Sequence, residues 1–176
     1  NTNSPFTNFE SMQIYTFNQI YDTGEQLTTE IELVTIFLNM LENEAFRKKF
    51  IDTYCLVAGS VFEPERCKEN ITRMAERTYS TLRYEGKDPY STANPMINSL
   101  STRQQTLINA LKNYWRFYLS GVEEQNVKIS SNINEARITL NDMIVPTNKF
   151  DGSLFGDIIL KASAPANYKF IGWKGL

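Results

Sequence analysis

Residues 38–54 read LNMLENEAFRKKFIDTY, and this stretch decides the helical part of the fold. Its apolar side chains recur at steps of three and four residues, which places them on one stripe of a helix. These side chains are Leu38, Leu41, Ala45, Phe46, Phe50 and Tyr54. Asn43 interrupts the run, and we expect it to cap a second helical segment whose Arg47, Lys48 and Lys49 face water. The stretch therefore predicts a pair of amphipathic helices packed on a core.

The helical pattern extends on both sides of this stretch. A first segment is expected to begin at Thr28 or Thr29, whose hydroxyl groups can cap its first turn. The second segment is expected to run to about Val57, with Gly59 ending it. Pro64 favours the first position of the next helix, because no backbone N–H is needed there. The predicted buried stripe of that helix consists of Ile71, Met74, Ala75, Tyr79 and Leu82.

A connector and a further helix follow. Residues 86–95 contain two prolines that disfavour regular structure, so a loop is expected. A long helix is predicted from Met96 or Ser101 to Ser120, because Ser101 and Gln104 have the spacing of a capping box. Trp115 lies on its apolar stripe, where a core anchor is a commoner role than a ligand platform.

From Val122 the hydrophobic period changes from about four to two. Strands are predicted at 127–130, 136–140, 143–145 and 158–162, with a turn at Asn141-Asp142 and loops at 149–152 and 155–157. The predicted fold class is α+β. Residues 1–122 would form an N-terminal arm and a helical subdomain of three to four packed helices, and residues 123–176 a small antiparallel β-rich module.

The stretch from Ala164 to Trp173 presents the aromatic residues Tyr168, Phe170 and Trp173 at close spacing. One interpretation is a sugar-stacking face made by these ligand-facing aromatics. The other is that they close the core of a small sheet, which is the commoner use of such a stripe.

Composition limits the classes of function. An apolar content of 41% in 176 residues supports a core, and a net charge of -2 predicts no electrostatic attraction to nucleic acid or to an anionic membrane. No run of 18 apolar residues is present, so no transmembrane segment is predicted. The polar start NTNSPFTNFES lacks the pattern of a signal peptide and suggests the interior of a longer protein.

Cys55 and Cys67 flank the connection between two predicted helices. A disulfide between them would suit an oxidising compartment, whereas two buried thiols would suit the usual preference of free cysteine for the interior. The chain has no His and no CxxC spacing, so no metal site is predicted. No nucleophile motif of an independent hydrolase is present. Catalysis by paired carboxylates stays open, because one sequence does not reveal such pairs.

Two motifs, in this order, resemble a known family. LENEAFRKKFIDTY contains an N-x-x-F-R-x-x-F step, and SVFEPERCKENITRMAE contains an F-x-P-E-R step. The residues of the two steps are Asn43, Phe46, Arg47 and Phe50, then Phe62, Pro64, Glu65 and Arg66. They resemble the later part of the CotH-kinase domain, found in secreted, spore coat protein H-like bacterial proteins. The resemblance covers roughly the first two thirds of the chain.

The resemblance implies that catalysis belongs to another part of the protein than this chain. CotH-like proteins resemble ATP-dependent Ser/Thr protein kinases that need a divalent metal, and their binding residues lie upstream in Trp-Asp and His-Asn motifs. This chain has no His, and neither Trp is followed by Asp, so no catalytic, cofactor or metal residue is assigned here. The chain would be a noncatalytic C-terminal part that supports an upstream catalytic lobe, in a secreted, cell-surface or periplasmic protein.

The end of the chain adds an alternative function. Residues 164–173 resemble the ending of small β modules in secreted bacterial proteins. The chain would then be a stand-alone extracellular adhesion or carbohydrate-binding module, whose partner is a cell-surface protein or a glycan.

Overall fold

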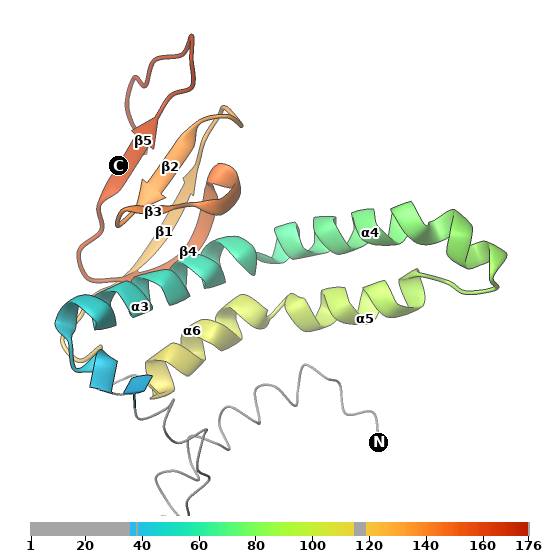
Figure 1. Cartoon of the computed structure of the whole chain (residues 1–176), viewed down its shortest axis with the longest axis horizontal. Coiled ribbons are helices and arrows are strands. Elements are labelled where there is room, and N and C mark those ends of the chain that lie inside the picture. The colour runs from blue at the N-terminus through green and yellow to red at the C-terminus, as the bar shows by residue number, and fades with distance from the viewer. Residues whose placement is uncertain (1–35, 38, 115–118, 176) are drawn as a thin grey trace, which may run out of the picture. The chain divides into compact units, whose positions relative to one another are not determined.

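The computed structural model describes residues 36–37, 39–114 and 119–175 (Figure 1). The chain divides into two compact units, residues 1–47 and 48–176. In the first unit, residues 36–37 and 39–41 are helical, in line with the predicted helical segment. The predicted start of that segment at Thr28 or Thr29 lies outside the described residues, as does Trp115.

Asn43 caps helix α3 (Glu44–Leu56), as the sequence predicts. Its Oδ1 atom accepts a hydrogen bond from the backbone N–H of Phe46 at 3.1 Å. The expected end at Gly59 is wrong, because a π-helical turn, η1 (Val57–Val61), continues the chain through that position. Gly59 is not in the left-handed conformation of a helix-ending glycine. It allows close packing instead, since a Cβ atom there would overlap the ring of Phe150.

Helix α4 (Pro64–Tyr84) begins with proline in its first turn, as predicted. The carboxylate of Glu63 caps it by accepting hydrogen bonds from the backbone N–H groups of Arg66 at 2.9 Å and Glu65 at 3.4 Å. The predicted buried stripe is only partly correct. Ala75 is buried, but the side chain of Met74 is 67% exposed and that of Tyr79 is exposed as well.

Helix α5 (Tyr90–Leu100) occupies part of the expected connector and contains Pro95. Its start is set by Asp88, whose Oδ1 accepts a hydrogen bond from the backbone N–H of Tyr90 at 3.1 Å. The prediction of a loop up to Pro95 is therefore wrong, because the helix forms despite the unfavourable interior proline.

Of the two starts predicted for the next helix, Ser101 is close to the observed one, whereas a helix from Met96 would be interrupted, and residues 119–120 at its expected end form a turn. Helix α6 (Arg103–Tyr114) begins after a break at residues 101–102. The expected capping box does not form, because the Ser101 hydroxyl donates backwards to the carbonyl of Asn98 at 2.7 Å. The side-chain amide of Gln104 donates to the backbone carbonyl of Asp151.

The strands form two antiparallel sheets. The first pairs β1 (Glu124–Ser130) with β4 (Lys149–Phe155), so that Ile129 lies opposite Phe150. In the second, β2 (Arg137–Leu140) lies between β3 (Met143–Ile144) and β5 (Leu160–Ser163). A short turn, η2 (Pro146–Asn148), leads from β3 towards β4.

Two details of the strands test the sequence analysis. Asn141 and Asp142 form the predicted turn, and both have positive φ angles, of 47° and 63°. The loop predicted at 149–152 is wrong, because these residues belong to β4. The Lys-Phe-Asp-Gly run resembles a turn signal, but Phe150 and Leu154 alternate into the core, as strand residues do.

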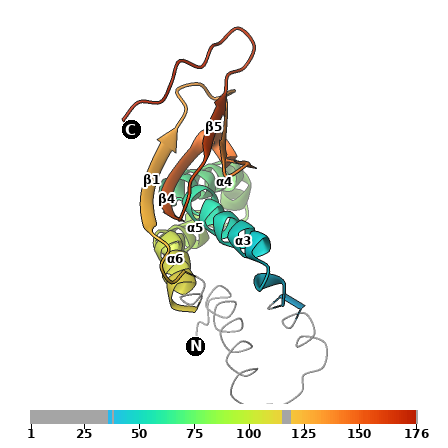
Figure 2. The same ribbon diagram turned by 90° about the vertical axis from the view of Figure 1, so that its left-hand side faces the viewer.

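One hydrophobic core joins helices and strands in the second unit (Figures 1 and 2). Its buried members lie on α3, η1, α6, β1, β2 and β4, together with Val145 between β3 and η2. Helices α4 and α5 pack against each other and contribute no member to this cluster. The α+β prediction, with packed helices followed by a small antiparallel strand module, is confirmed.

Candidate functional site

The sequence-predicted aromatic residues lie on the segment that follows β5, residues 164–175, which we call the aromatic loop. Phe170 and Trp173 contact each other, with ring centroids 5.5 Å apart and planes inclined by 68°. Trp173 is half-buried and packs against the core, whereas Tyr168 is 58% and Phe170 44% exposed. Trp173 therefore helps to close the core, and the other two rings face solvent.

The backbone of the aromatic loop is irregular, with one turn at Ala166 and Asn167, and forms no strand. The N–H of Tyr168 donates to the carbonyl of Pro165 at 3.1 Å, which closes a β-turn. Asn167 in this turn has a φ angle of 69°, a conformation that asparagine tolerates. Gly172 has a φ angle of 143°, a conformation that favours glycine.

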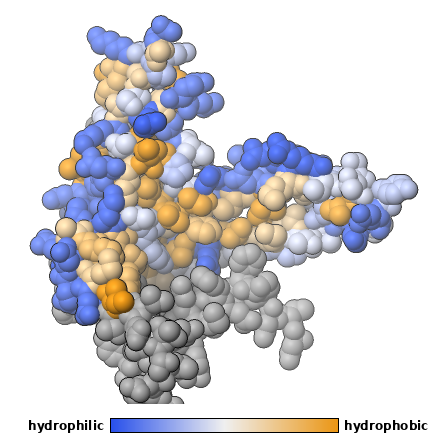
Figure 3. All heavy atoms as spheres, viewed as in Figure 1, coloured by the Kyte–Doolittle hydropathy of each residue, from blue (hydrophilic) through white to orange (hydrophobic). Residues whose placement is uncertain are grey.

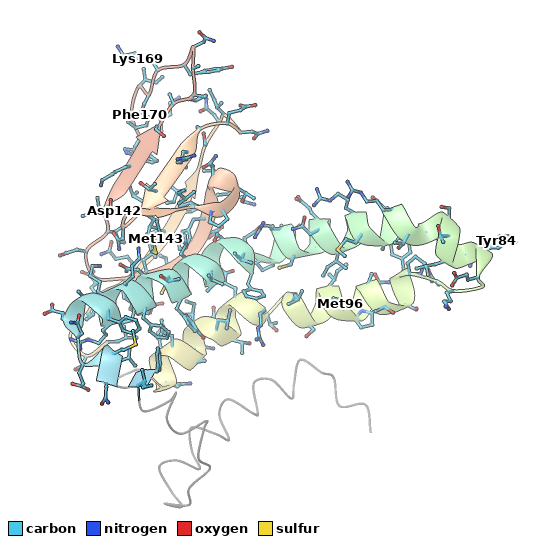
Figure 4. The ribbon with its side chains drawn as sticks, viewed as in Figure 1. Tyr84, Met96, Asp142, Met143, Lys169 and Phe170 are labelled. Carbon is cyan, nitrogen blue, oxygen red and sulfur yellow. The ribbon has the colours of Figure 1, made fainter. Side chains whose placement is uncertain are left out.

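Ile171 is a candidate that the sequence analysis missed. Its side chain is 92% exposed, between Phe170 and Gly172. The exposed residue Lys169 is its near neighbour, and Figure 4 shows Lys169 and Phe170 on the loop beyond β5. A two-residue period assigns Ile171 to the face opposite Phe170, so alternation alone could not predict that both side chains are exposed.

A second candidate surface lies on the hairpin of α4 and α5. The buried apolar side chains of these two helices are those of Cys67, Ala75 and Ala93. Met74, Tyr79 and Tyr84 are exposed, and we call these three residues the hairpin surface. The rings of Tyr79 and Tyr90 lie 6.0 Å apart, and the guanidinium group of Arg83 lies 5.9 Å from the centre of the Tyr79 ring. In Figure 3, apolar side chains gather along the line where α4 and α5 meet.

Cys55 and Cys67 are free thiols, and both are buried. Burial, followed by the negative charges of Asp52 and Glu124, raises the pKa of the Cys55 thiol to about 12. Burial also raises the pKa of Cys67, although the positive charge of Arg66 opposes the shift. Because the thiolate is the reactive form, neither cysteine has the properties of a catalytic nucleophile.

Several carboxylates are paired with lysines that belong to other elements. Glu124 of β1 lies 2.5 Å from the Nζ atom of Lys112 of α6, and this hydrogen bond lowers the pKa of Glu124. Glu63 lies 3.5 Å from the Nζ atom of Lys149. Within residues 36–37, 39–114 and 119–175, no three His, Cys, Asp or Glu side chains are grouped to hold a metal ion. No helix in this described part is long and apolar enough to cross a membrane.

Comparison with known protein families, curated proteins and solved structures finds no match to this chain. The similarity to CotH-like proteins therefore stays a prediction from the two sequence motifs. The aromatic loop and the hairpin surface are the two candidate binding surfaces of the described residues.

Proposed function

We propose that this chain is a noncatalytic binding module, the C-terminal part of a CotH-like protein, and that it supports a catalytic lobe of the same protein. The observation that carries the proposal is the exposure of large apolar side chains on the hairpin surface. Tyr84 at the end of α4 is 94% exposed, and Met74 is 67% exposed and is not a member of the shared core of helices and strands.

The packing of α4 on α5 explains why this surface is available. Helices α4 and α5 contact each other, and among their apolar side chains the small ones of Ala75 and Ala93 are buried, whereas those of Met74 and Tyr84 are exposed. Burying a methionine or tyrosine side chain against a partner stabilises a complex by about 1.5–3 kcal/mol. Met74 and Tyr84 expose larger fractions than Tyr79, so a partner protein would gain more by covering either of them.

The chemistry of the described residues supports a binding role. The most buried thiol has a raised pKa, and Glu63 and Glu124 are held by lysines and backbone amides. ATP and a divalent metal would be requirements of the upstream lobe. The secreted, cell-surface or periplasmic location belongs to the same proposal and rests on the sequence motifs.

The first experiment is to measure the intact mass of the native protein, captured with an antibody against this 20.3 kDa chain. We expect a species much larger than the chain, from which the adjoining lobe can be identified and produced. A native species of the same mass as the chain would contradict the proposal.

The second experiment measures binding of that lobe to the chain by isothermal titration calorimetry. Met74→Asp should weaken binding by about tenfold or more, because it places a charge in the apolar contact. Asn113→Asp is the matched control, since it adds the same charge to an exposed position of α6, outside the hairpin surface. Equal effects of the two variants would exclude the hairpin surface as the contact.

A stand-alone adhesion or carbohydrate-binding module is the alternative. Its support is the contact between Phe170 and Trp173 near an exposed Tyr168. The angle of 68° between the two rings is unfavourable for carbohydrate binding, because inclined rings offer no common flat face on which a sugar could stack.

A further inference from the structure

We propose that the aromatic loop docks this protein onto the surface of a bilayer that contains anionic lipids. The proposal does not depend on the proposed function, because it uses a different surface and a different kind of partner. It rests on three features of residues 164–175: exposed apolar side chains, an excess of positive charge and an anchored base.

The apolar side chains of the loop are exposed next to one another. Phe170 and Ile171 are adjacent in sequence, and Tyr168 is exposed two residues earlier. The loop leaves the sheet after β5 and projects beyond the strands as an irregular segment (Figures 1 and 2). An apolar projection can enter the boundary between headgroups and acyl chains, where tyrosine and tryptophan rings are favoured.

The charge of this part of the chain is positive although the whole chain is slightly negative. Residues 158–176 contain Lys161, Lys169 and Lys174 and no acidic residue. Lys161 is paired with Asp142, whereas Lys169 and Lys174 lie on the loop itself and are exposed. The net charge of -2 therefore conceals a local basic segment beside the apolar side chains.

Charges at the neighbouring end of the sheet do not cancel this excess. Arg137, at the start of β2, lies opposite Ser163 at the end of β5 and adds a positive charge at the base of the loop. Glu135 precedes it and adds one negative charge. The two loop lysines remain in excess, and lysine side chains extend readily to phosphate groups while their stems lie along apolar surface.

Trp173 fixes the base of the loop. Its ring packs against the core and the edge of Phe170, so insertion of Phe170 and Ile171 would not require the loop to order on binding. A pre-ordered loop loses less conformational entropy when it binds.

A membrane fits these features better than a protein or a glycan does. A stable protein contact needs a broad complementary face. A glycan stacked on the rings of Phe170 and Trp173 would leave Ile171 exposed to water. In an anionic bilayer, the lysines can pair with lipid phosphate groups while the apolar side chains enter the acyl-chain boundary.

The test uses flotation of the 176-residue chain with vesicles of phosphatidylcholine, alone or containing about 30% phosphatidylglycerol. We expect stronger binding to the anionic vesicles, by about 25-fold for two lysines near the surface, and a loss of this preference at high salt. Lys169→Gln should weaken anionic binding by about fivefold. Ile171→Asp should weaken it by about tenfold or more. Equal binding to both vesicles, or no binding, would overturn the proposal.

A matched control separates loop insertion from a general effect of added charge. Ile144→Asp alters another exposed isoleucine, on β3, and should leave binding to vesicles unchanged if its circular dichroism spectrum matches that of the unaltered chain. Equal losses from Ile144→Asp and Ile171→Asp would contradict insertion of the loop.

Fluorescence then identifies the ligand class directly. In a Trp115→Phe background, Trp173 is the sole tryptophan, and its emission should shift to the blue with anionic vesicles. A shift with soluble polysaccharides and none with vesicles would replace the membrane proposal by glycan binding.

Discussion

The ring of Phe150 on β4 occupies the space into which a side chain on Gly59 would point. Gly59 belongs to the π-helical turn that follows α3, so this contact joins the helices directly to the strands. Gly152, two residues after Phe150, extends the contact, because a Cβ atom there would lie only 3.0 Å from the Cα atom of Gly59. The backbones of Gly59 and Gly152 therefore lie in direct contact.

Gly59→Ala is expected to destabilise the protein by about 1–3 kcal/mol, because the added methyl group must displace a fully buried ring. Urea denaturation followed by circular dichroism measures the free energy of unfolding. A double variant with Phe150→Leu should be less destabilised than the sum of the two single changes, since the smaller side chain makes room for the methyl group. Simple additivity would mean that the two residues do not contact each other.

Glu63→Ala should destabilise the protein by about 1–2 kcal/mol, because the N–H groups of Glu65 and Arg66 lose their acceptor at the start of α4. Glu63→Gln keeps an acceptor oxygen and should lose less. Lys149→Met removes only the ion pair and should cost under about 1 kcal/mol. If Lys149→Met proved as harmful as Glu63→Ala in thermal denaturation, the ion pair rather than the cap would be the main contribution.

The sequence predicted those features that depend on local chemistry. The cap at Asn43, proline in the first turn of α4 and the Asn141-Asp142 turn are each set by residues within a few positions. The features it missed depend on distant contacts. Gly59 carries the usual signal of a helix end, but its role is set by Phe150, far along the chain.

The candidate sites show the same limit. The aromatic loop is predicted from the spacing of Tyr168, Phe170 and Trp173, but Ile171 is not, because a two-residue period assigns it to the face opposite Phe170. Periodicity predicts Met74 on the buried stripe of α4, but its side chain is exposed. A helical period shows which side chains share a face, and it does not show how much of that face another element covers.

Thr147 is expected to be a site at which the protein can be stabilised. Its φ angle is 61°, in the left-handed region that β-branched residues avoid. Thr147→Gly should raise the free energy of unfolding by about 1 kcal/mol, because glycine adopts this conformation without the steric cost. Thr139→Gly, within β2, is the control and should lower stability. A lower melting temperature for Thr147→Gly would show that the turn depends on the threonine side chain.

The two thiols should be inert in the folded protein. Ellman's reagent at neutral pH is expected to react with neither Cys55 nor Cys67, and with both in concentrated guanidinium chloride. The raised pKa of Cys55 means that its contribution to stability is complete below the model-compound value of 9.0 and is lost as the pH rises towards about 12. Absence of titratable thiol in the unfolded, unreduced protein would instead demonstrate a disulfide.

Glu124→Gln tests the ion pair between α6 and β1 through its pH dependence. Because Lys112 holds the pKa of Glu124 below 4.5, the pair stabilises the fold above that pH, and the contribution is lost as the pH falls through the lowered value. The variant should lose roughly 0.2–1 kcal/mol at neutral pH, a modest amount because Lys112 is largely in contact with water, and the difference should vanish in acid. Urea denaturation across this pH range measures it, and Lys112→Met should show the same profile. A difference that persists below both pKa values would assign the loss to packing of the side chain rather than to its charge.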